Sequence, residues 1–210
     1  MKAVIFDLDG VLCSTDAFHY QAWKAIADEL GIPFDETVNN RLRGVSRMAS
    51  LEIILEQADR PFSEEEKLLL AEKKNGIYRS LLTRLTPEDR MPGATETLQL
   101  LRERGWLLAI GSSSKNTPVI LERLGLDGFF DAVSDGNNIT RSKPDPEVFL
   151  KAAEMLSVEA ADCLVVEDAV AGAQAAHAGG MKAACVGDAA RQGAGDWNLQ
   201  SLRELQDILA

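Results

Sequence analysis

The sequence predicts an α/β fold, a doubly wound parallel sheet that carries an inserted all-helical domain. Short apolar runs alternate with longer amphipathic stretches, a pattern typical of βαβ units around a parallel sheet. The first apolar run lies about 100 residues before the second, far more than one crossover helix requires. The residues in between must therefore fold as a separate unit.

The predicted strands are short apolar runs. Four are clear and one, the third in chain order, is weaker: Ala3–Phe6, Leu107–Ile110, Asp131–Ser134, Cys163–Val166 and Ala183–Val186. Helix-like segments precede the later runs, for example Ala94–Glu103 and Ala169–Ala178, and each is followed by a glycine suited to a helix C-terminus.

The insert is predicted to span residues 15–89, leaving residues 1–14 and 90–210 for the α/β domain. It contains no convincing strand, and its amphipathic segments predict helices at Ala17–Leu30, Glu36–Arg43, Met48–Gln57 and Glu64–Leu82. Turn and helix-capping residues stand at both edges, in Ser14-Thr15-Asp16 and Thr86-Pro87-Glu88-Asp89. These edges would make natural hinges.

Composition narrows the class of protein. Hydrophobic residues make up 46% and charged residues 26%, as in an ordinary globular chain. The formal net charge of -11 would repel a polyanion, so nucleic acid is not expected as a partner. The chain has no apolar stretch of about 18 residues and no signal-peptide pattern, so no membrane association is expected.

Cysteine usage indicates a reducing, cytoplasmic setting. Cys13, Cys163 and Cys185 are odd in number and widely spaced, which argues against a disulfide framework or a zinc cluster.

Polar residues gather where the predicted strands end. Asp7 and Asp9 follow the first run, Ser112 the second, and Glu167-Asp168 the fourth. In an open parallel sheet the ligand binds outside the carboxyl ends of the strands, so these side chains would face one crevice. Any one of them alone is more often a helix cap or a solvated carboxylate. Four carboxylates together need a neutralising cation, and Mg²⁺ suits them.

The stretch Asp7-Leu8-Asp9-Gly10-Val11 resembles the signature of the haloacid dehalogenase superfamily in its phosphotransferase form. By the same resemblance, Ser112 matches the phosphate-binding Ser/Thr, Lys143 the charge-balancing lysine and Glu167-Asp168 the acidic metal motif. The resemblance covers the whole chain and implies a Rossmann-like core with a helical cap at the position of the insert.

The resemblance also implies a mechanism. Asp7 would be the nucleophile that forms an aspartyl-phosphate, and Asp9 the general acid and base. Asp7, the backbone carbonyl of Asp9 and Asp168 would bind Mg²⁺, with Glu167 in or just behind that shell. Ser112 and Lys143 would hold the oxygens of the transferring phosphoryl group. The last two residues thus complete the transfer site.

The insert resembles the β-phosphoglucomutase-like subfamily of this superfamily. His19 and Trp23 stand four residues apart on one helical face, and a loop at residues 43–47 places Gly44 between two arginines. Trp23 is by default a core residue in such a domain. The subfamily resemblance implies substrate-binding roles for Trp23, Arg43, Gly44, Val45, Arg47, Ser50, Lys74, Asn75, Ser114, Lys115 and Asn116, and catalytic roles for Thr15 and His19.

The function implied by this resemblance is interconversion of β-glucose 1-phosphate and glucose 6-phosphate through β-glucose 1,6-bisphosphate, by a monomeric enzyme. A mutase needs a second phosphate site, which the resemblance assigns to Arg47 with Ser114, Lys115 and Asn116. A sugar-phosphate phosphatase, which needs only one such site, is the alternative. A non-catalytic phosphosugar-binding regulator is a third hypothesis, although such a protein could dispense with Asp9.

Overall fold

The computed structural model of the chain describes residues 1–42 and 46–209. Contacts divide these into two compact units, Met1–Ser14 with Leu85–Ala210, and Thr15–Arg84. The first is called the core below and the second the insert. The boundary after Arg84 falls slightly before the predicted one at residue 89, and the insert's standing as a separate domain stays a prediction.

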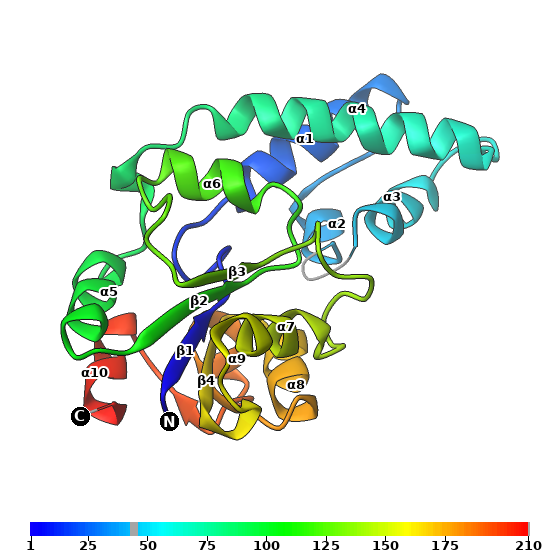
Figure 1. Cartoon of the computed structure of the whole chain (residues 1–210). Helices are drawn as coiled ribbons and strands as arrows, with labels where there is room; N and C mark the ends of the chain where they lie inside the picture. The colour runs from blue at the N-terminus through cyan, green and yellow to red at the C-terminus, as the bar shows by residue number, and fades with distance from the viewer. Residues whose placement is uncertain (43–45, 210) are drawn as a thin grey trace. The chain divides into compact units, whose positions relative to one another are not determined.

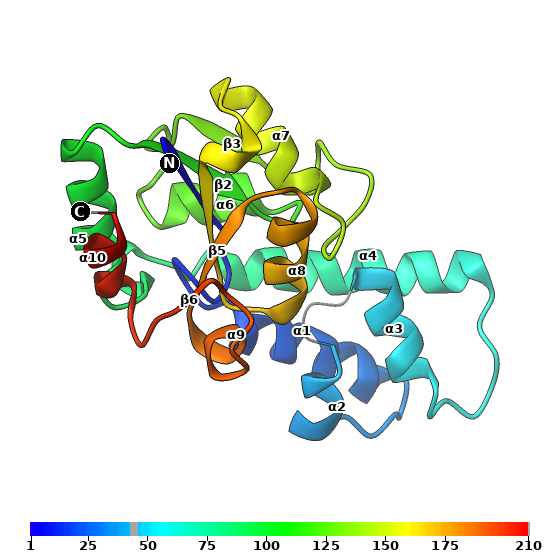
Figure 2. The same cartoon turned by 90° about the horizontal axis from the view of Figure 1, so that it is seen from below.

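The core is built on one parallel sheet of six strands in the order β3-β2-β1-β4-β5-β6; β1 to β4 are labelled in Figure 1, and β5 and β6 in Figure 2. The strands are β1 (Ala3–Phe6), β2 (Leu107–Gly111), β3 (Ala132–Ser134), β4 (Cys163–Glu167), β5 (Lys182–Cys185) and β6 (Trp197–Asn198). The doubly wound α/β fold predicted from the alternation of apolar runs is therefore confirmed. The two-residue β6 was not predicted, and β5 lies one residue earlier than expected because Val186 already precedes the next helix.

The helices of the core connect these strands. They are α5 (Ala94–Glu103), α6 (Thr117–Arg123), α7 (Glu147–Leu156), α8 (Val170–Ala178), α9 (Gly187–Arg191) and α10 (Leu205–Ile208). Short 3-10 turns occur at Pro87–Asp89, Ala160–Asp162 and Leu202–Glu204. The C-terminal α10 lies beside α5 in both views (Figures 1 and 2), and the Arg104 guanidinium after α5 reaches the carbonyls of Gln206 and Leu209.

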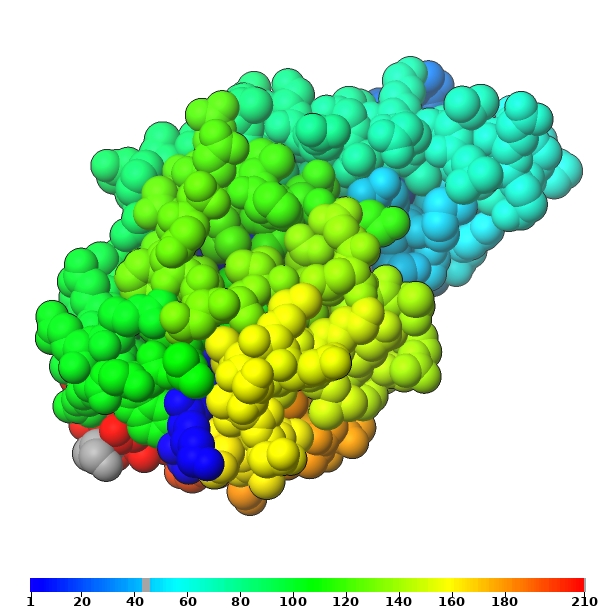
Figure 3. Space-filling view, in the orientation of Figure 1, coloured from blue at the N-terminus to red at the C-terminus, as the bar shows by residue number. Residues whose placement is uncertain are grey.

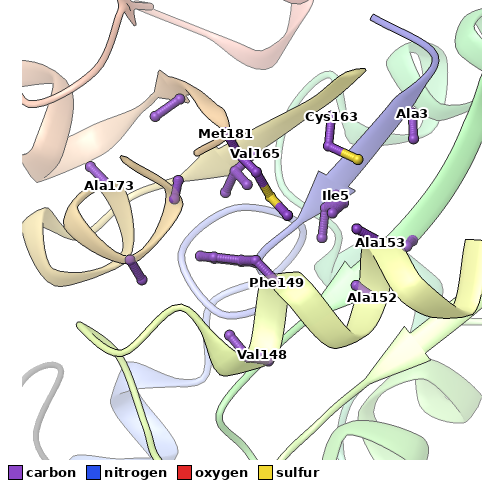
Figure 4. Packing of buried hydrophobic residues seen from close by; sticks show 14 of the residues in the cluster. Ala3, Ile5, Val148, Phe149, Ala152, Ala153, Cys163, Val165, Ala173 and Met181 are labelled. Atoms are coloured by element: carbon purple, nitrogen blue, oxygen red, sulfur yellow. The ribbon is translucent and has the colours of Figure 1, made fainter. Parts of the chain in front are cut away.

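The middle of the sheet is buried because its strands are apolar on both faces. Residues 3 to 6 are fully buried, as expected for a central strand of a parallel sheet. In Figure 4, Phe149 and Ala152 of α7 face Ile5 of β1, and Val165 of β4 lies nearby. The space-filling view shows the first residues of the chain between the segments that lead to β2 and β4 (Figure 3). The backbone of Lys2 bonds to both segments, at Leu107 and Asp162.

The two ends of the insert join core segments that are bonded to each other. The N–H of Met91 donates to the carbonyl of Leu12 at 2.8 Å, and Cys13 forms an antiparallel bridge with Arg90. The core therefore holds together the segment through which the chain leaves for the insert and the segment through which it returns.

The described residues of the insert form four helices and no strand, as predicted. These are α1 (Asp16–Glu29), α2 (Glu36–Asn40), α3 (Arg47–Leu55) and α4 (Glu64–Leu82). A capping box starts α4, since Ser63 and Glu66 exchange side chain to backbone hydrogen bonds. Trp23, Ile54 and Ala71 belong to the insert's own apolar core. Among the helices of the described part of the chain, none has the length and apolar character needed to cross a bilayer.

Candidate active site

The sheet register brings three predicted site residues to neighbouring strand ends. Phe6, the last residue of β1, pairs with Ile110 of β2 on one side and Val166 of β4 on the other. Asp7 directly follows Phe6, Glu167 follows Val166 and ends β4, and Ser112 follows Gly111, the last residue of β2. They meet because neighbouring parallel strands present their carboxyl ends at one edge.

Lys143 joins two of these strand ends. Its ammonium lies 2.6 Å from Oδ1 of Asp7 and 2.6 Å from Oε1 of Glu167. Burial disfavours the charged lysine, but the two carboxylates together hold the pKa of Lys143 above its ordinary value. The Nζ also lies 4.7 Å from the centre of the Phe149 ring. Lys143 is therefore a fixed, positively charged group beside Asp7.

Three carboxylates form a cluster in which ligand oxygens of Asp7, Glu167 and Asp168 all lie within 4.8 Å of one another. Burial raises the pKa of Asp7 to about 7 against the opposing charge of Lys143. Burial, followed by the charges of Asp7 and Glu167, raises the pKa of Asp168 to about 8. One ammonium cannot balance three carboxylates, so the cluster fits a hard divalent cation, which prefers oxygen ligands.

Close backbone approach shapes this cluster as well. Gly10 has φ of +88°, a conformation that side chains rarely adopt, and a Cβ there would lie 2.1 Å from Oδ2 of Asp168. The glycine of the Asp7-Leu8-Asp9-Gly10 stretch is thus needed for both its backbone shape and its lack of a side chain. Asp9, just before it, is partly buried and its backbone bridges to Cys13.

The predicted phosphate-binding residues after β2 share one short loop. The Ser112 side chain is buried, and its Oγ accepts a hydrogen bond from the N–H of Ser114 at 3.2 Å. The Oγ of Ser114 in turn accepts from the N–H of Asn116 at 3.2 Å, and the Lys115 carbonyl accepts from the Asn137 side chain. These turns lead directly into α6.

In the insert, a second group forms between α1 and α4. The Lys74 ammonium lies 2.8 Å from Nδ1 of His19 and above the ring faces of Trp23 and Tyr78, at 4.8 and 4.7 Å from their centres. Lys74 and Trp23 are each only 3% exposed, so this charge is held among aromatic rings. The hydroxyl of Thr15 lies 2.8 Å from that of Tyr78.

This arrangement sets the protonation of His19. An ammonium can only donate, so Nδ1 of His19 must accept from Lys74, which places the imidazole proton on Nε2. Burial, then the positive charges of Lys74 and Arg47, keep the pKa of His19 well below its usual range. His19 is therefore a neutral imidazole that offers an N–H donor at Nε2.

The remaining predicted residues of the insert do not all join this group. Arg47, at the start of α3, donates to Oδ1 of Asn75 at 2.8 Å, which links two predicted substrate contacts. Ser50 is 3% exposed on the same helix. The predicted positions Arg43, Gly44 and Val45 lie outside the described residues.

Two residues that the sequence patterns did not indicate also shape the site. Tyr78 contacts three predicted site residues, and its spacing of one helical turn after Lys74 was a usable signal. Gly172 packs so closely against the carboxylate of Glu167 that a Cβ atom at residue 172 would have no room. Its signal was weaker, because a glycine near the start of a small-residue helix has many explanations.

Comparison with known proteins gives a consistent result. The family of haloacid dehalogenase-like hydrolases matches residues 1–180. A β-phosphoglucomutase of Bacillus subtilis is 46% identical over 189 residues, which covers 89% of this chain and 84% of that protein. A phosphatase of phosphorylated carbohydrates from Thermotoga maritima is 32% identical, over 87% of this chain and 83% of that protein.

A solved structure agrees with these relatives. The crystal structure of a β-phosphoglucomutase from Clostridium difficile superposes with a TM-score of 0.91 at 37% identity. That match covers 100% of this chain and 96% of the other. The likeness thus includes both the core and the insert.

Proposed function

Because the chain belongs to the haloacid dehalogenase-like hydrolase family, we propose that it acts as a β-phosphoglucomutase, interconverting β-glucose 1-phosphate and glucose 6-phosphate. The observation that carries this proposal is the likeness to the Bacillus mutase, which is greater than that to the Thermotoga phosphatase and extends through the insert. Small sugar phosphates are accordingly the substrates. The reaction passes through β-glucose 1,6-bisphosphate.

The chemistry starts at Asp7. A carboxylate oxygen of Asp7 attacks phosphorus as the bond to the leaving sugar oxygen breaks, which gives an aspartyl-phosphate. Asp9 gives its proton to that leaving oxygen. In the second half, Asp9 takes the proton of the sugar hydroxyl that attacks the aspartyl-phosphate, and Asp7 is released. What supports Asp7 as the nucleophile is its place at a strand end beside Lys143.

Lys143 and Ser112 hold the phosphoryl group during transfer. The Lys143 ammonium is oriented by Asp7 and Glu167 before any substrate binds, so little reorganisation is needed when negative charge develops. Ser112 is fixed by the turn that Ser114 forms over it and supplies a hydroxyl donor. Phosphoryl transfer asks a protein mainly for positioning of this kind.

The cation is proposed to be Mg²⁺, held by Asp7, the Asp9 carbonyl and Asp168, with Glu167 in or just behind that shell. When bound, it would neutralise the carboxylates and the transferring phosphoryl oxygens. Removal of divalent ions with a chelator should abolish turnover, and added Mg²⁺ should restore it. Full activity after exhaustive chelation would refute the metal requirement.

Residues of the insert are proposed to select the sugar phosphate. His19 offers its Nε2 proton to an oxygen acceptor, and Trp23 and Lys74 belong to the same buried group. Arg47, with Ser114, Lys115 and Asn116, is proposed to bind the phosphate that is not being transferred. The proposed mutase requires this second phosphate contact, whereas a phosphatase does not.

One assay separates the two activities. Purified protein receives β-glucose 1-phosphate, Mg²⁺ and a trace of bisphosphate, and both glucose 6-phosphate and free phosphate are measured. Glucose 6-phosphate should accumulate with little free phosphate. Release of phosphate without glucose 6-phosphate would instead establish a sugar-phosphate phosphatase, and the absence of either product would favour a binding protein.

Substitutions then test the residue roles. Asp7→Asn should lower kcat at least about a thousandfold, as expected when a covalent nucleophile is lost. Asp9→Asn should leave substrate binding largely intact while it removes proton transfer. Asp127→Asn, the same change at an exposed position of the core, is the matched control and should keep wild-type turnover. Near-normal turnover of Asp7→Asn would exclude covalent catalysis at this residue.

We also propose that the protein acts as a monomer in the cytoplasm. Light scattering at assay concentration tests the first statement, and cell fractionation tests the second.

A further inference from the structure

Tyr78 of α4 is a buried residue that contacts three predicted site residues of the insert. It is 2% exposed. Its hydroxyl lies 2.8 Å from that of Thr15, and its ring stacks on His19 with centres 4.1 Å apart and planes inclined by 26°. The ammonium of Lys74, one helical turn earlier, lies 4.7 Å from the centre of the same ring. A single side chain therefore meets all three groups.

The hydroxyl contact between Tyr78 and Thr15 takes the place of the helix-capping hydrogen bond that Thr15 would ordinarily make. Thr15 is the N-cap residue of α1, where a threonine hydroxyl usually accepts from a backbone N–H of the first turn. Its side chain makes no such capping bond, and it is fully buried against Tyr78 instead. The orientation of the Thr15 hydroxyl, at the first residue of the insert, is thus set by a partner 63 positions along the chain.

The contact between Tyr78 and His19 fixes the orientation of the His19 imidazole, and with it the direction of the Nε2–H donor. Lys74 donates to Nδ1 at one edge of the imidazole, and Tyr78 covers one face. With an edge and a face both occupied, rotation of the imidazole would break the hydrogen bond or the stack. The direction of the Nε2 proton is therefore determined by Lys74 and Tyr78 together.

We propose that Tyr78 is a positioning residue for phosphoryl transfer, whose hydroxyl orients Thr15 and whose ring holds His19 and Lys74. The proposal rests on the mutase function proposed above. The hydroxyl and the ring act on different partners, so two substitutions separate them. Tyr78→Phe removes the hydroxyl and with it the bond to Thr15, whereas Tyr78→Leu also removes the stack on His19 and the ring face under Lys74.

The experiment measures kcat, KM and the imidazole resonances of His19 by ¹H–¹⁵N NMR for both variants. Tyr78→Phe should lower kcat about fivefold, the effect of one lost hydrogen bond, and leave the His19 tautomer unchanged. Tyr78→Leu should lower kcat about a hundredfold, as expected when a catalytic group is misplaced by about 1 Å. It should also replace the single Nε2–H tautomer by a mixture that titrates closer to neutral pH, because loss of the covering ring would expose the imidazole to water and free it to turn away from Lys74.

Tyr20 supplies the matched control, because it is the other tyrosine of the chain and lies on α1 of the same insert. Its ring packs on Phe34 at 5.5 Å. Tyr20→Phe and Tyr20→Leu should keep wild-type kcat and an unchanged His19 spectrum. Equal effects of the Tyr20 and Tyr78 substitutions would show that Tyr78 is an ordinary core residue with no positioning role.

The proposal is overturned if folded Tyr78→Leu keeps kcat within twofold of wild type and an unperturbed His19 tautomer. If Tyr78→Leu does not fold, wild-type kcat in Tyr78→Phe overturns the role assigned to the hydroxyl. Absence of mutase turnover in the wild-type protein would remove the proposed function only, since the NMR comparison tests positioning without turnover.

Discussion

Substitution of Gly172 by alanine should destabilise the protein even though alanine is the better helix former. Gly172 lies in α8, and a Cβ at this position would fall 2.0 Å from both Cδ and Oε1 of Glu167. The carboxylate of Glu167 cannot simply swing away. Its Oε1 accepts from Lys143 at 2.6 Å, its Oε2 accepts from the N–H of Ala169 at 2.7 Å, and the residue is only 1% exposed.

The magnitude follows from two opposing effects. Alanine in a helix interior gains about 1 kcal/mol over glycine. Separating a buried ion pair costs about 3–5 kcal/mol, because the partner charge is left uncompensated. The second effect is larger, so the free energy of unfolding should fall by about 2–4 kcal/mol in Gly172→Ala. Displaced Glu167 would also disturb the carboxylate cluster, so the Mg²⁺ concentration for half-maximal activity should rise about 10-fold or more.

Urea unfolding measures the first quantity, and a Mg²⁺ titration of turnover measures the second. Gly76→Ala is the matched control, since Gly76 lies inside α4 and a Cβ added there would meet nothing within 4 Å beyond the backbone of its own helix. That variant should gain up to about 1 kcal/mol in the free energy of unfolding. If Gly172→Ala proves as stable as Gly76→Ala and needs no additional Mg²⁺, the proposed steric conflict with Glu167 is refuted.

Three further predictions concern the rest of the fold. Burial acts to raise the pKa of Asp196, but hydrogen bonds from Lys182 and the Ala183 N–H outweigh it and lower the pKa to about 2. A lowered carboxyl pKa stabilises the fold above the ordinary value of 3.8 and stops doing so as the pH falls through about 2. Asp196→Asn should therefore be less stable than wild type at pH 7, and acid titration of unfolding should show the difference closing between about pH 4 and pH 2. Alkylation at pH 8 should be slow in the native protein and fast in denaturant, because burial raises the thiol pKa of all three cysteines, Cys13, Cys163 and Cys185. Rapid labelling of the folded protein would contradict this. Ser63→Ala should lower the free energy of unfolding by about 1 kcal/mol, since it removes the capping hydrogen bond at the start of α4, and an unchanged urea midpoint would show that the cap contributes nothing.

The parallel sheet was predictable because its strands are apolar on both faces and stand out as short runs. Residues 3 to 6 and 163 to 166 were placed correctly for this reason. The helix α5 was also predicted with its observed bounds, since its apolar positions repeat with helical spacing. By contrast, β6 is two residues long and exists only because it pairs with β5, a contact that no local pattern records.

Some contacts of the candidate site could likewise be predicted from the sequence, and others could not. The meeting of Asp7 with Glu167 follows from the general rule for strand ends in parallel sheets, so sequence alone could anticipate it. The place of Lys143 does not follow from any spacing, because it lies on a loop far along the chain, and the family resemblance was needed to single it out. The interaction of Tyr78 with Thr15 is equally non-local and emerged only from the structure.

The bonded segments at the edge of the core bear on how such a protein can change over evolution. Because Leu12 bonds to Met91 and Cys13 bridges to Arg90, the two points where the chain leaves and re-enters the core are held together by the core itself. A loop with pinned ends can grow or shrink at small entropic cost, since the cost rises only slowly with its length. The insert can therefore be replaced by another of different length while the strand register that aligns Asp7 with Glu167 stays unchanged.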